Sequence, residues 1–185
     1  MNHENAIRLI DVKPSDQHLL EQIKETYINS FPPEERRDYD KLIDLFRHSH
    51  TMHIYACQTA TLDYAGFITC WRFEKFSFIE HFAINSKARN GGIGSLFLKE
   101  VLRRQNKPVI LEAEEPLNDL CKRRIAFYER NGFVQGNVPY FQPPYRKGEP
   151  TIPMVLLSYG NINLENEYQA IVPTIYTEVY NYDIK

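Results

Sequence analysis

The stretch Arg89-Asn90-Gly91-Gly92-Ile93-Gly94-Ser95 decides the fold because of the segments on either side of it. The segment before it, Phe76 to Ile84, is short and mostly apolar, which indicates a buried strand. The segment after it, Ile93 to Leu102, repeats apolar residues at helical spacing. A glycine-rich turn between a strand and a helix N-terminus directs backbone N–H groups towards an anion, and Arg89 adds a positive charge. The sequence therefore predicts a phosphate or pyrophosphate site.

Other kinds of glycine-rich loop have to be weighed against this prediction. The phosphate loop of nucleotide hydrolases has Lys followed by Ser or Thr after its last glycine, whereas Gly94 is followed by Ser95-Leu96, which excludes that loop. A dinucleotide fingerprint needs a third glycine where this chain has Phe97, although the acidic segment from Glu112 to Glu115 could imitate its ribose-binding carboxylate. A plain glycine-rich turn remains as the structural alternative.

A second motif follows about 30 residues later: Ala126-Phe127-Tyr128-Glu129-Arg130-Asn131-Gly132-Phe133. Arg89-x-x-Gly92-x-Gly94 together with this aromatic-Tyr-x-x-x-Gly-Phe pattern resembles the two signatures of the GNAT superfamily of N-acetyltransferases. The resemblance covers roughly residues 7–158. It implies an α/β fold in which a mixed β-sheet is flanked by helices on both faces. It also implies acetyl-CoA as the acyl donor.

The composition is that of one ordinary globular domain. Of 185 residues 43% are hydrophobic and 25% charged, and the formal net charge is −2, so nothing indicates disorder or a nucleic-acid partner. Cys57, Cys70 and Cys121 are odd in number and widely spaced, which argues against a disulfide framework and favours reduced thiols in the cytoplasm. We expect neither a secretory signal nor a membrane segment, because the N-terminus is polar and no apolar run reaches about 20 residues.

The expected elements follow the order β-α-α-β-β-β-α-β-α-β-β, which is the order of the GNAT fold. Apolar stripes at helical spacing define the inward faces of two of the helices. They are Leu19, Ile23, Tyr27 and Phe31 in the first helix, and Leu117, Leu120, Ile125 and Tyr128 in the helix that Gly132 ends as a left-handed C-cap.

Residues 159–185 lie beyond the expected domain, residues 7–158, and are expected to form a C-terminal helical extension. A helical stripe runs from Leu164 to Val179, with a kink at Pro173. Packing on its own domain is the first expectation and a dimer contact is the alternative. The chain is therefore expected to be a monomer or a homodimer.

The resemblance also implies which residues hold the donor. Backbone N–H groups from Asn90 to Ser95 are expected to hold the pyrophosphate, with a charge-assisted contact from Arg89. The N–H groups of Phe82, Ala83 and Ile84 are expected to contact the thioester and pantetheine and to stabilise the developing oxyanion. Seven residues before the tyrosine, where the superfamily often has Asn, this chain has Cys121; Asn118, one turn earlier, is expected to substitute.

Glu80 is the candidate general base. An alkylamine with a pKa of about 10 must lose a proton before it attacks a thioester at neutral pH. Glu80 shares strand parity with Phe78 and Phe82, so its carboxylate is expected to be partly desolvated and its pKa raised. The superfamily often places a base near this point, acting directly or through water. A carboxylate paired with an Arg or a backbone N–H is the structural alternative, and His81 is the reserve candidate.

Tyr128 is the candidate general acid, as the resemblance implies. A phenol of pKa about 10 could protonate a thiolate of pKa about 8.5 only through close positioning in the transition state. A core tyrosine on an apolar helix stripe is the structural alternative.

The function expected is transfer of an acetyl group from acetyl-CoA to a primary amine by direct attack. The acceptor, a small molecule or a peptide, is expected to meet aromatic residues and acidic ones such as Glu34, Glu35, Glu112 and Glu114. The alternative is an acyl-CoA-binding module without transferase activity. His48, His50 and His53 lack a nearby carboxylate or thiolate cluster, so no metal is expected.

Overall fold

The computed structural model describes residues 6–89 and 91–183, and contacts group the chain into two compact units. The first unit comprises the chain up to Arg72 together with Ile79–Asn106. The second comprises Phe73–Phe78 together with the chain from Lys107 onward.

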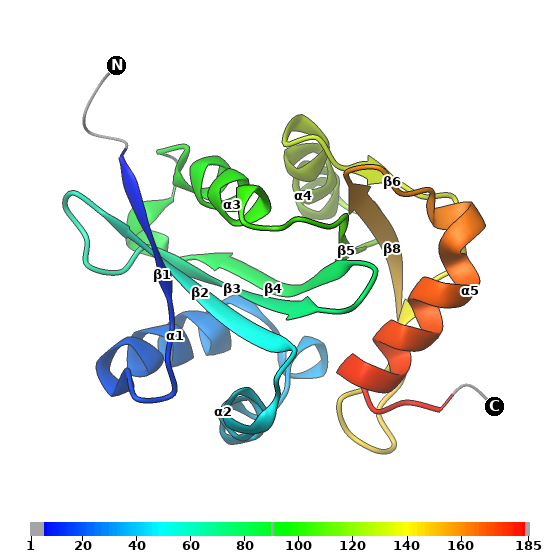
Figure 1. Cartoon of the computed structure of the whole chain (residues 1–185), viewed down its shortest axis with the longest axis horizontal. Helices are drawn as coiled ribbons and strands as arrows, with labels where there is room; N and C mark the ends of the chain where they lie inside the picture. The colour runs from blue at the N-terminus through cyan, green and yellow to red at the C-terminus, as the bar shows by residue number, and fades with distance from the viewer. Residues whose placement is uncertain (1–5, 90, 184–185) are drawn as a thin grey trace. The chain divides into compact units, whose positions relative to one another are not determined.

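The first unit is built on strands in the order β1-β2-β3-β4, with antiparallel β1–β2 and β2–β3 pairs. Within this unit α1 and α2 lie on one side of the strands and α3 lies on the other (Figure 1). The strands are β1 (Ile7–Asp11), β2 (Met52–Thr59), β3 (Gly66–Arg72) and β4 (Ser77–Ile84), the last belonging to this unit from Ile79. The helices are α1 (Gln17–Ser30), α2 (Tyr39–His48) and α3 (Ile93–Arg103), with short 3₁₀ turns η2 (Pro33–Glu35) and η3 (Ser86–Ala88).

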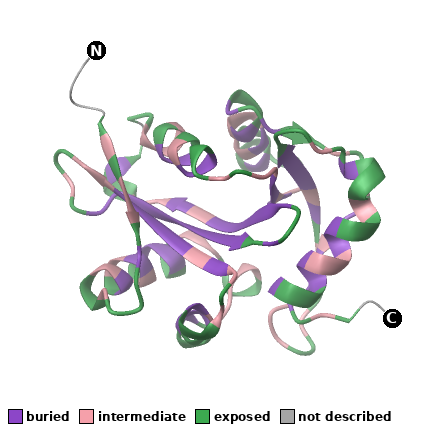
Figure 2. Cartoon of the chain, viewed as in Figure 1, coloured by how far each residue is buried: buried purple, intermediate pink, exposed green. Residues whose placement is uncertain are grey.

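The core of the first unit consists of β2 and β3, which are buried on both faces (Figure 2). Helices cover both faces, so apolar and aromatic residues fill successive positions instead of alternating ones. Ile54, Tyr55, Phe67 and Ile68 are at most 2% exposed.

Helix α1 buries Ile23 and Tyr27 as expected, but it buries Leu20 in place of Leu19. Leu20, Ile23 and Tyr27 are buried, whereas Leu19 and Phe31 are only half-buried. The expectation of Leu19 was wrong because the i, i+3, i+7 spacing of the buried residues selects Leu20.

The second unit is built on strands in the order β5-β8-β6, with the short β7 pairing with β8, all antiparallel. Helix α4 packs on β5 and β6. The strands are β5 (Val109–Glu114), β6 (Val134–Gln135), β7 (Phe141–Gln142) and β8 (Ile152–Tyr159). The helices are α4 (Asp119–Arg130), α5 (Leu164–Thr174) and a π-helical turn, η4 (Ile175–Val179). The expected element order is confirmed, with β7 as an addition.

Helix α4 corrects one part of the sequence analysis. Leu117 and Leu120 were expected to face inward, but they are 82% and 65% exposed. The helix begins at Asp119, so Leu117 precedes it, and the buried face runs through Cys121, Ile125 and Tyr128. The left-handed C-cap is confirmed, since Gly132 has φ of 90° and its N–H donates to the carbonyl of Glu129.

The C-terminal segment belongs to the second unit and changes geometry just after Pro173. Proline has no N–H, so the α-helical bond to the carbonyl of Gln169 is lost, and α5 continues as the π-helical turn η4. Ile171, Ile175, Tyr176 and Val179 are buried, and the Tyr176 hydroxyl donates to the Phe141 carbonyl at 2.9 Å. The α-helix passes through Pro173 and ends at Thr174, so the kink expected at Pro173 remains a prediction.

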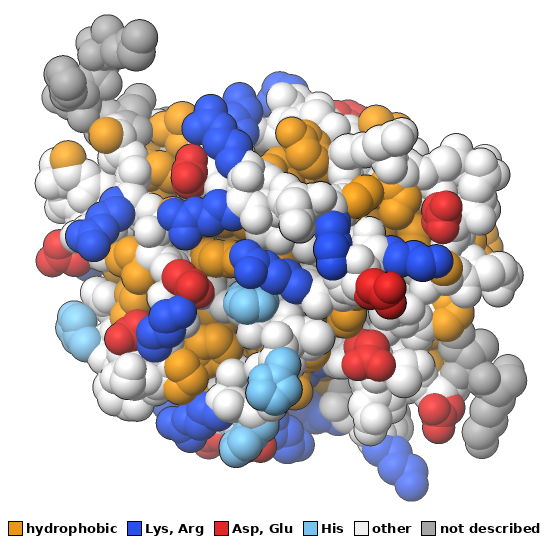
Figure 3. Space-filling view, in the orientation of Figure 1, with side chains coloured by type: hydrophobic (Ala, Val, Ile, Leu, Met, Phe, Trp, Pro, Cys, Tyr) orange, Lys and Arg blue, Asp and Glu red, His pale blue; other side chains and the backbone are white. Residues whose placement is uncertain are grey.

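The surface carries charges of both signs. On the face in Figure 3, Lys and Arg side chains are interspersed with Asp and Glu. In the part of the chain that the structure describes, no helix is long and apolar enough to cross a bilayer.

Candidate active site

Glu80 lies in the middle of β4 and is buried, with 8% of its surface exposed. Its side chain is fully buried in an ion pair with Arg37, whose own side chain is 10% exposed. Trp71 on β3 donates its indole N–H to the second carboxylate oxygen of Glu80 at 2.8 Å. Because a guanidinium and an indole both stabilise negative charge, the site holds Glu80 as an ionised carboxylate. A carboxylate paired with an arginine is the structural alternative to a general base that the sequence left open for Glu80.

The backbone of Arg37 is held by Tyr27 of α1. The Arg37 N–H donates to the Tyr27 hydroxyl at 2.9 Å, and that hydroxyl donates to the Arg37 carbonyl at 3.3 Å. Tyr27 is fully buried and packs edge-on against His81, with ring centroids 4.9 Å apart. The loop between α1 and α2 is therefore held by hydrogen bonds at Arg37, the residue whose guanidinium pairs with Glu80.

His81 is buried and neutral. Its ring lies 3.2 Å from the Thr69 hydroxyl through Nδ1 and 3.3 Å from the Glu35 carbonyl through Nε2. Thr69 already accepts the backbone N–H of His81, so its hydroxyl proton points to Nδ1, while Nε2–H donates to the carbonyl. Burial, together with the nearby Arg37 charge, lowers the pKa of His81 to about 3. Such an imidazole is a weak base, and both of its nitrogens are hydrogen-bonded. These observations argue against His81 as the general base.

The glycine loop leads directly into α3. Gly92 is the N-cap residue and has φ of 75°, a left-handed conformation that favours glycine. Among the described residues, a Cβ added at Gly92 would meet no atom within 4 Å, and one added at Gly91 would meet Ile93 alone, at 3.9 Å. The space above both glycines is thus open in front of a helix N-terminus whose first N–H groups lack intrahelical acceptors. Asn90, also expected to bind here, lies outside the described residues.

Arg89 points back to the chain before the loop. Its Nε donates to the carbonyl of Ile84 at 3.1 Å, and its side chain is exposed. This bond ties the loop to the end of β4, and the remaining guanidinium N–H groups extend from an exposed position. Ser95 lies in the first turn of α3, where its N–H donates to the Gly92 carbonyl at 3.1 Å.

The end of β4 is pressed against β3. A Cβ at Gly66 would lie 2.5 Å from the carbonyl oxygen of Ala83, so only glycine allows the two backbones to approach this closely. Phe82 packs edge-on against Phe97 of α3 with ring centroids 5.9 Å apart, and Ile84 is half-buried. The N–H groups of Phe82, Ala83 and Ile84 remain predicted donors.

Tyr128 lies on the buried face of α4 in the second unit and is 8% exposed. Its ring packs edge-on against Phe127 and Phe133, with centroids 5.4 and 5.7 Å away. Burial raises the pKa of Tyr128 to about 12, partly offset by Arg124. Its hydroxyl makes no hydrogen bond to the described residues, and it is not among the fully buried polar atoms that lack a partner.

Asn118 caps the N-terminus of α4. Its side-chain oxygen accepts the N–H of Cys121 at 2.9 Å, which satisfies one of the donors that a helix N-terminus leaves open. The Cys121 thiol donates to Glu114 at 3.6 Å, and Glu114 also pairs with Arg124. Asn118 therefore stabilises the start of α4 as its N-cap, and a contact of Asn118 with pantetheine remains a prediction.

Glu112 of β5 accepts hydrogen bonds from two tyrosines in the second unit. Tyr140 donates to one carboxylate oxygen at 2.5 Å and Tyr180 to the other. Burial and the Glu112 charge raise the pKa of both phenols well above their usual value. Tyr145 lies against Tyr180 with ring centroids 5.1 Å apart. Of the four acidic residues expected near the acceptor, Glu112 lies among these tyrosines, whereas Glu34 and Glu35 lie in η2 of the first unit. No group of His, Cys, Asp and Glu suited to a metal occurs among the residues described.

Comparison with known proteins identifies the family. A model of the GNAT acetyltransferase domain matches residues 49–135. A structure from Bacteroides thetaiotaomicron assigned to the GNAT acetyltransferases is 35% identical, with a TM-score of 0.90 over 95% of this chain and 99% of that one. The chain belongs to the GNAT family. The GNAT fold, a mixed β-sheet flanked by helices with a further helix at the C-terminus, is thereby confirmed. GNAT acetyltransferases take their acyl group from acetyl-CoA.

Two more distant structures share the fold. A variant of the spermidine N-acetyltransferase SpeG from Vibrio cholerae is 12% identical, with a TM-score of 0.60 over 82% of this chain and 92% of that one. The ribosomal-protein-S18-alanine N-acetyltransferase from Escherichia coli is also 12% identical, with a TM-score of 0.60 over 83% and 93% of the two chains. At these identities the likeness concerns the fold alone. No curated protein sequence gives a match.

Sequence analysis missed Arg37 and Trp71, the two partners of Glu80. Arg37 lies in a charged segment without periodicity, 43 residues before Glu80, and no local pattern indicates such a pair. Trp71 is the only tryptophan in the chain. A buried indole needs an acceptor, which is a general signal, but it does not say which residue supplies one.

Proposed function

We propose that this GNAT protein is an N-acetyltransferase that transfers an acetyl group from acetyl-CoA to a primary amine by direct attack. The observation that carries the proposal is the family membership together with Tyr128, which stands on the family's second motif in α4 and makes no hydrogen bond through its hydroxyl to the described residues. This hydroxyl can therefore donate its proton to a reacting ligand atom without breaking a hydrogen bond to a described residue.

The loop of Gly91, Gly92 and Gly94 fits a diphosphate. Open space at Gly91 and Gly92 and the N-terminus of α3 behind them favour a doubly charged anion, and Arg89 stands at the rim. Gly92 supplies a backbone conformation that other residues adopt only with strain. Bound here, acetyl-CoA would supply an activated thioester; the chain's own residues supply orientation and proton transfer.

Glu80 is proposed to accept the proton of the amine, directly or through water. The attacking nitrogen forms the new N–C bond while the C–S bond breaks, and the proton leaves the nitrogen for the carboxylate. Arg37 and Trp71 favour the ionised form of Glu80, which can accept a proton, and the same two contacts weaken it as a base, so proton transfer depends on close positioning of the amine or the water. N–H groups of Phe82 to Ile84 are proposed to stabilise the oxyanion.

Tyr128 is proposed to donate its proton to the departing thiolate. Its pKa of about 12 lies above that of a thiol, about 8.5, so the transfer depends on close positioning in the transition state. Cys121 is not proposed as a nucleophile, because its thiol donates to Glu114 and no histidine base accompanies it in the sequence motif.

The acceptor is proposed to be a small-molecule or peptide amine. The distant relatives named above are N-acetyltransferases for spermidine and for a ribosomal-protein alanine, which supports an amine of either size. We propose a cytoplasmic location, since Cys57, Cys70 and Cys121 are all unpaired thiols. A monomer or homodimer without nucleic-acid or membrane partners completes the proposal.

A second candidate, an acyl-CoA-binding module without turnover, is favoured by the Glu80–Arg37 ion pair. Glu80→Gln and Tyr128→Phe separate the two functions. If either variant loses free CoA release with an amine panel while acetyl-CoA binding persists, the transferase stands. Unchanged release in both variants would remove the catalytic assignments, and binding without release in the parent chain would support the binding module.

A further inference from the structure

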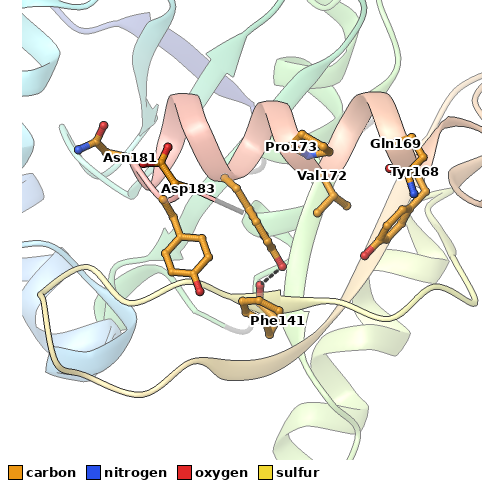
Figure 4. Close-up of a pocket in the computed structure, with 9 residues that line it drawn as sticks. Phe141, Tyr168, Gln169, Val172, Pro173, Asn181 and Asp183 are labelled. Atoms are coloured by element: carbon orange, nitrogen blue, oxygen red, sulfur yellow. Dashed lines mark hydrogen bonds between the residues drawn. The ribbon is translucent and has the colours of Figure 1, made fainter. Parts of the chain in front are cut away.

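A pocket of about 810 Å³ opens in the second unit beside β7 and the C-terminal helical segment. Phe141, Tyr168, Tyr176 and Tyr182 give it four aromatic walls, and Asp183 is the one charged residue among the described residues that line it (Figure 4). This volume lies in the range of small-molecule sites. The residues proposed for acetyl transfer do not line it.

Three of the rings form a corner. The Phe141 and Tyr176 centroids lie 5.2 Å apart, and the Tyr182 ring stands at 90° to Tyr176 and at 86° to Phe141. Rings at such angles present faces in more than one direction, and the negative quadrupole of an aromatic face attracts a cation. The corner therefore favours a positively charged ligand over an anion.

Several hydrogen-bond acceptors line the pocket, beside the side-chain amides of Gln169 and Asn181, which both donate and accept. Pro173 has no N–H to bond the carbonyl of Gln169, and both residues line the pocket. The hydroxyl protons of Tyr168 and Tyr176 are directed to the backbone carbonyls of Pro139 and Phe141, at 3.0 and 2.9 Å. A carbonyl without its helical donor, phenol lone pairs and the Asp183 carboxylate together match a ligand that carries N–H donors and positive charge.

Hydrogen bonds hold the tail of the chain in place at the pocket. The Tyr182 N–H donates to the Tyr176 carbonyl at 2.9 Å, and the Asn181 N–H donates to the Thr177 carbonyl at 3.1 Å. Asn181 adopts φ of 50°, a left-handed conformation that asparagine tolerates. This turn fixes Tyr182 and Asp183 at the pocket without a bound ligand, so little ordering is needed for binding.

We propose that this pocket binds an alkylammonium cation. The ammonium group lies against the aromatic corner and the Asp183 carboxylate, and its N–H groups meet the exposed acceptors. The site goes beyond the proposed function, since binding here requires neither acetyl-CoA nor the residues of acetyl transfer.

The test compares two ligands of equal length on the full chain without acetyl-CoA. Calorimetry measures binding of 1,4-diaminobutane, a dication at neutral pH, and of 1,4-butanediol, its neutral counterpart. Methyl NMR follows Val172, which lines the pocket, and Val109 of β5 as an internal reference. The diamine is expected to bind and shift Val172 but not Val109, and the diol is expected to bind at least tenfold more weakly. Equal binding of both ligands, or no shift at Val172, would overturn the proposal.

Variants locate the site. Asp183→Asn is expected to weaken diaminobutane binding about threefold to fivefold, the scale of an exposed ion pair. Tyr182→Leu is expected to weaken it by a similar factor, through loss of a ring face. Glu178→Gln is the matched control, because it removes the same charge from an exposed position of η4 outside the pocket, and it should leave the affinity within twofold. An Asp183→Asn/Tyr182→Leu double variant that binds as tightly as the parent chain would contradict the assignment.

Discussion

The ion pair of Glu80 with Arg37 leads to the most informative perturbation, Glu80→Gln. The Glu80 side chain is fully buried and that of Arg37 is 10% exposed, so the change removes the negative partner of a guanidinium that water barely reaches. Breaking such a pair from one side costs about 3–5 kcal/mol. For a chain of 185 residues, this corresponds to a fall in Tm of roughly 6–20 °C.

The double variant Glu80→Gln/Arg37→Met removes both charges and separates stability from catalysis. Replacing a buried pair by uncharged residues is often close to neutral, so the double variant is expected within about 2 kcal/mol of the parent chain. If Glu80 is the base, kcat/KM of both variants falls by about 10²–10⁴ at neutral pH. If the ion pair is purely structural, the double variant regains activity with its fold.

Urea unfolding followed by circular dichroism measures stability, and thiol release from acetyl-CoA measures activity. Arg37→Met alone is the companion control, since it leaves the buried carboxylate without the guanidinium. Stability of Glu80→Gln within about 0.5 kcal/mol of the parent, the range of ordinary surface changes, would refute the reasoning about the ion pair.

Three further predictions concern the acid, the glycine loop and pH. Tyr128→Phe should lower kcat at least tenfold and leave acetyl-CoA affinity within twofold in calorimetry, because only the O–H is lost; equal kcat would end its role as acid. Gly92→Ala, with φ of 75°, should cost about 1 kcal/mol and weaken acetyl-CoA binding, whereas Gly148→Ala, with φ of 91° and equally open space, should cost the same without affecting binding; equal binding losses would contradict the loop assignment. The His81 pKa of about 3 in the folded chain lies below the unfolded value of about 6.5, so the unfolded state binds more protons between these values and stability should fall, by up to about 1.4 kcal/mol per pH unit, as pH drops through this range. Urea titrations at several pH values measure how the free energy of unfolding changes with pH. His81→Gln should reduce this change, whereas His48→Gln, at an exposed position, should leave it as in the parent chain. An equal pH dependence in all three chains would refute the low pKa of His81.

Local patterns carried most of the fold prediction. Gly132 ends α4 because a left-handed residue is needed there, and regular α-helix gives way to a π-helical turn two residues after Pro173, which lacks an N–H. Both effects act within one turn of the residue, so the sequence displays them. The inward faces were less certain: Leu117 and Leu120 are apolar but exposed, since the start of α4 at Asp119, set by the Asn118 cap, decides which side faces the core.

The surroundings of the candidate site could not be read from the sequence. The charged segment before α2 looks like a solvated connection, yet Tyr27 holds the Arg37 backbone so that its guanidinium reaches Glu80. Such contacts join residues far apart in the chain, and only the packed fold brings them together. Likewise the tyrosines at Glu112 come from the loop before β7 and from the C-terminus, two segments that no local pattern connects.

The measurement that tests the central claim most directly is calorimetric titration with acetyl-CoA, with NAD and ADP as controls, followed by free CoA release on an amine panel. The account predicts tight binding that is specific for acetyl-CoA, and turnover with one class of amine. Absence of acetyl-CoA binding, or equal preference for NAD, would contradict it.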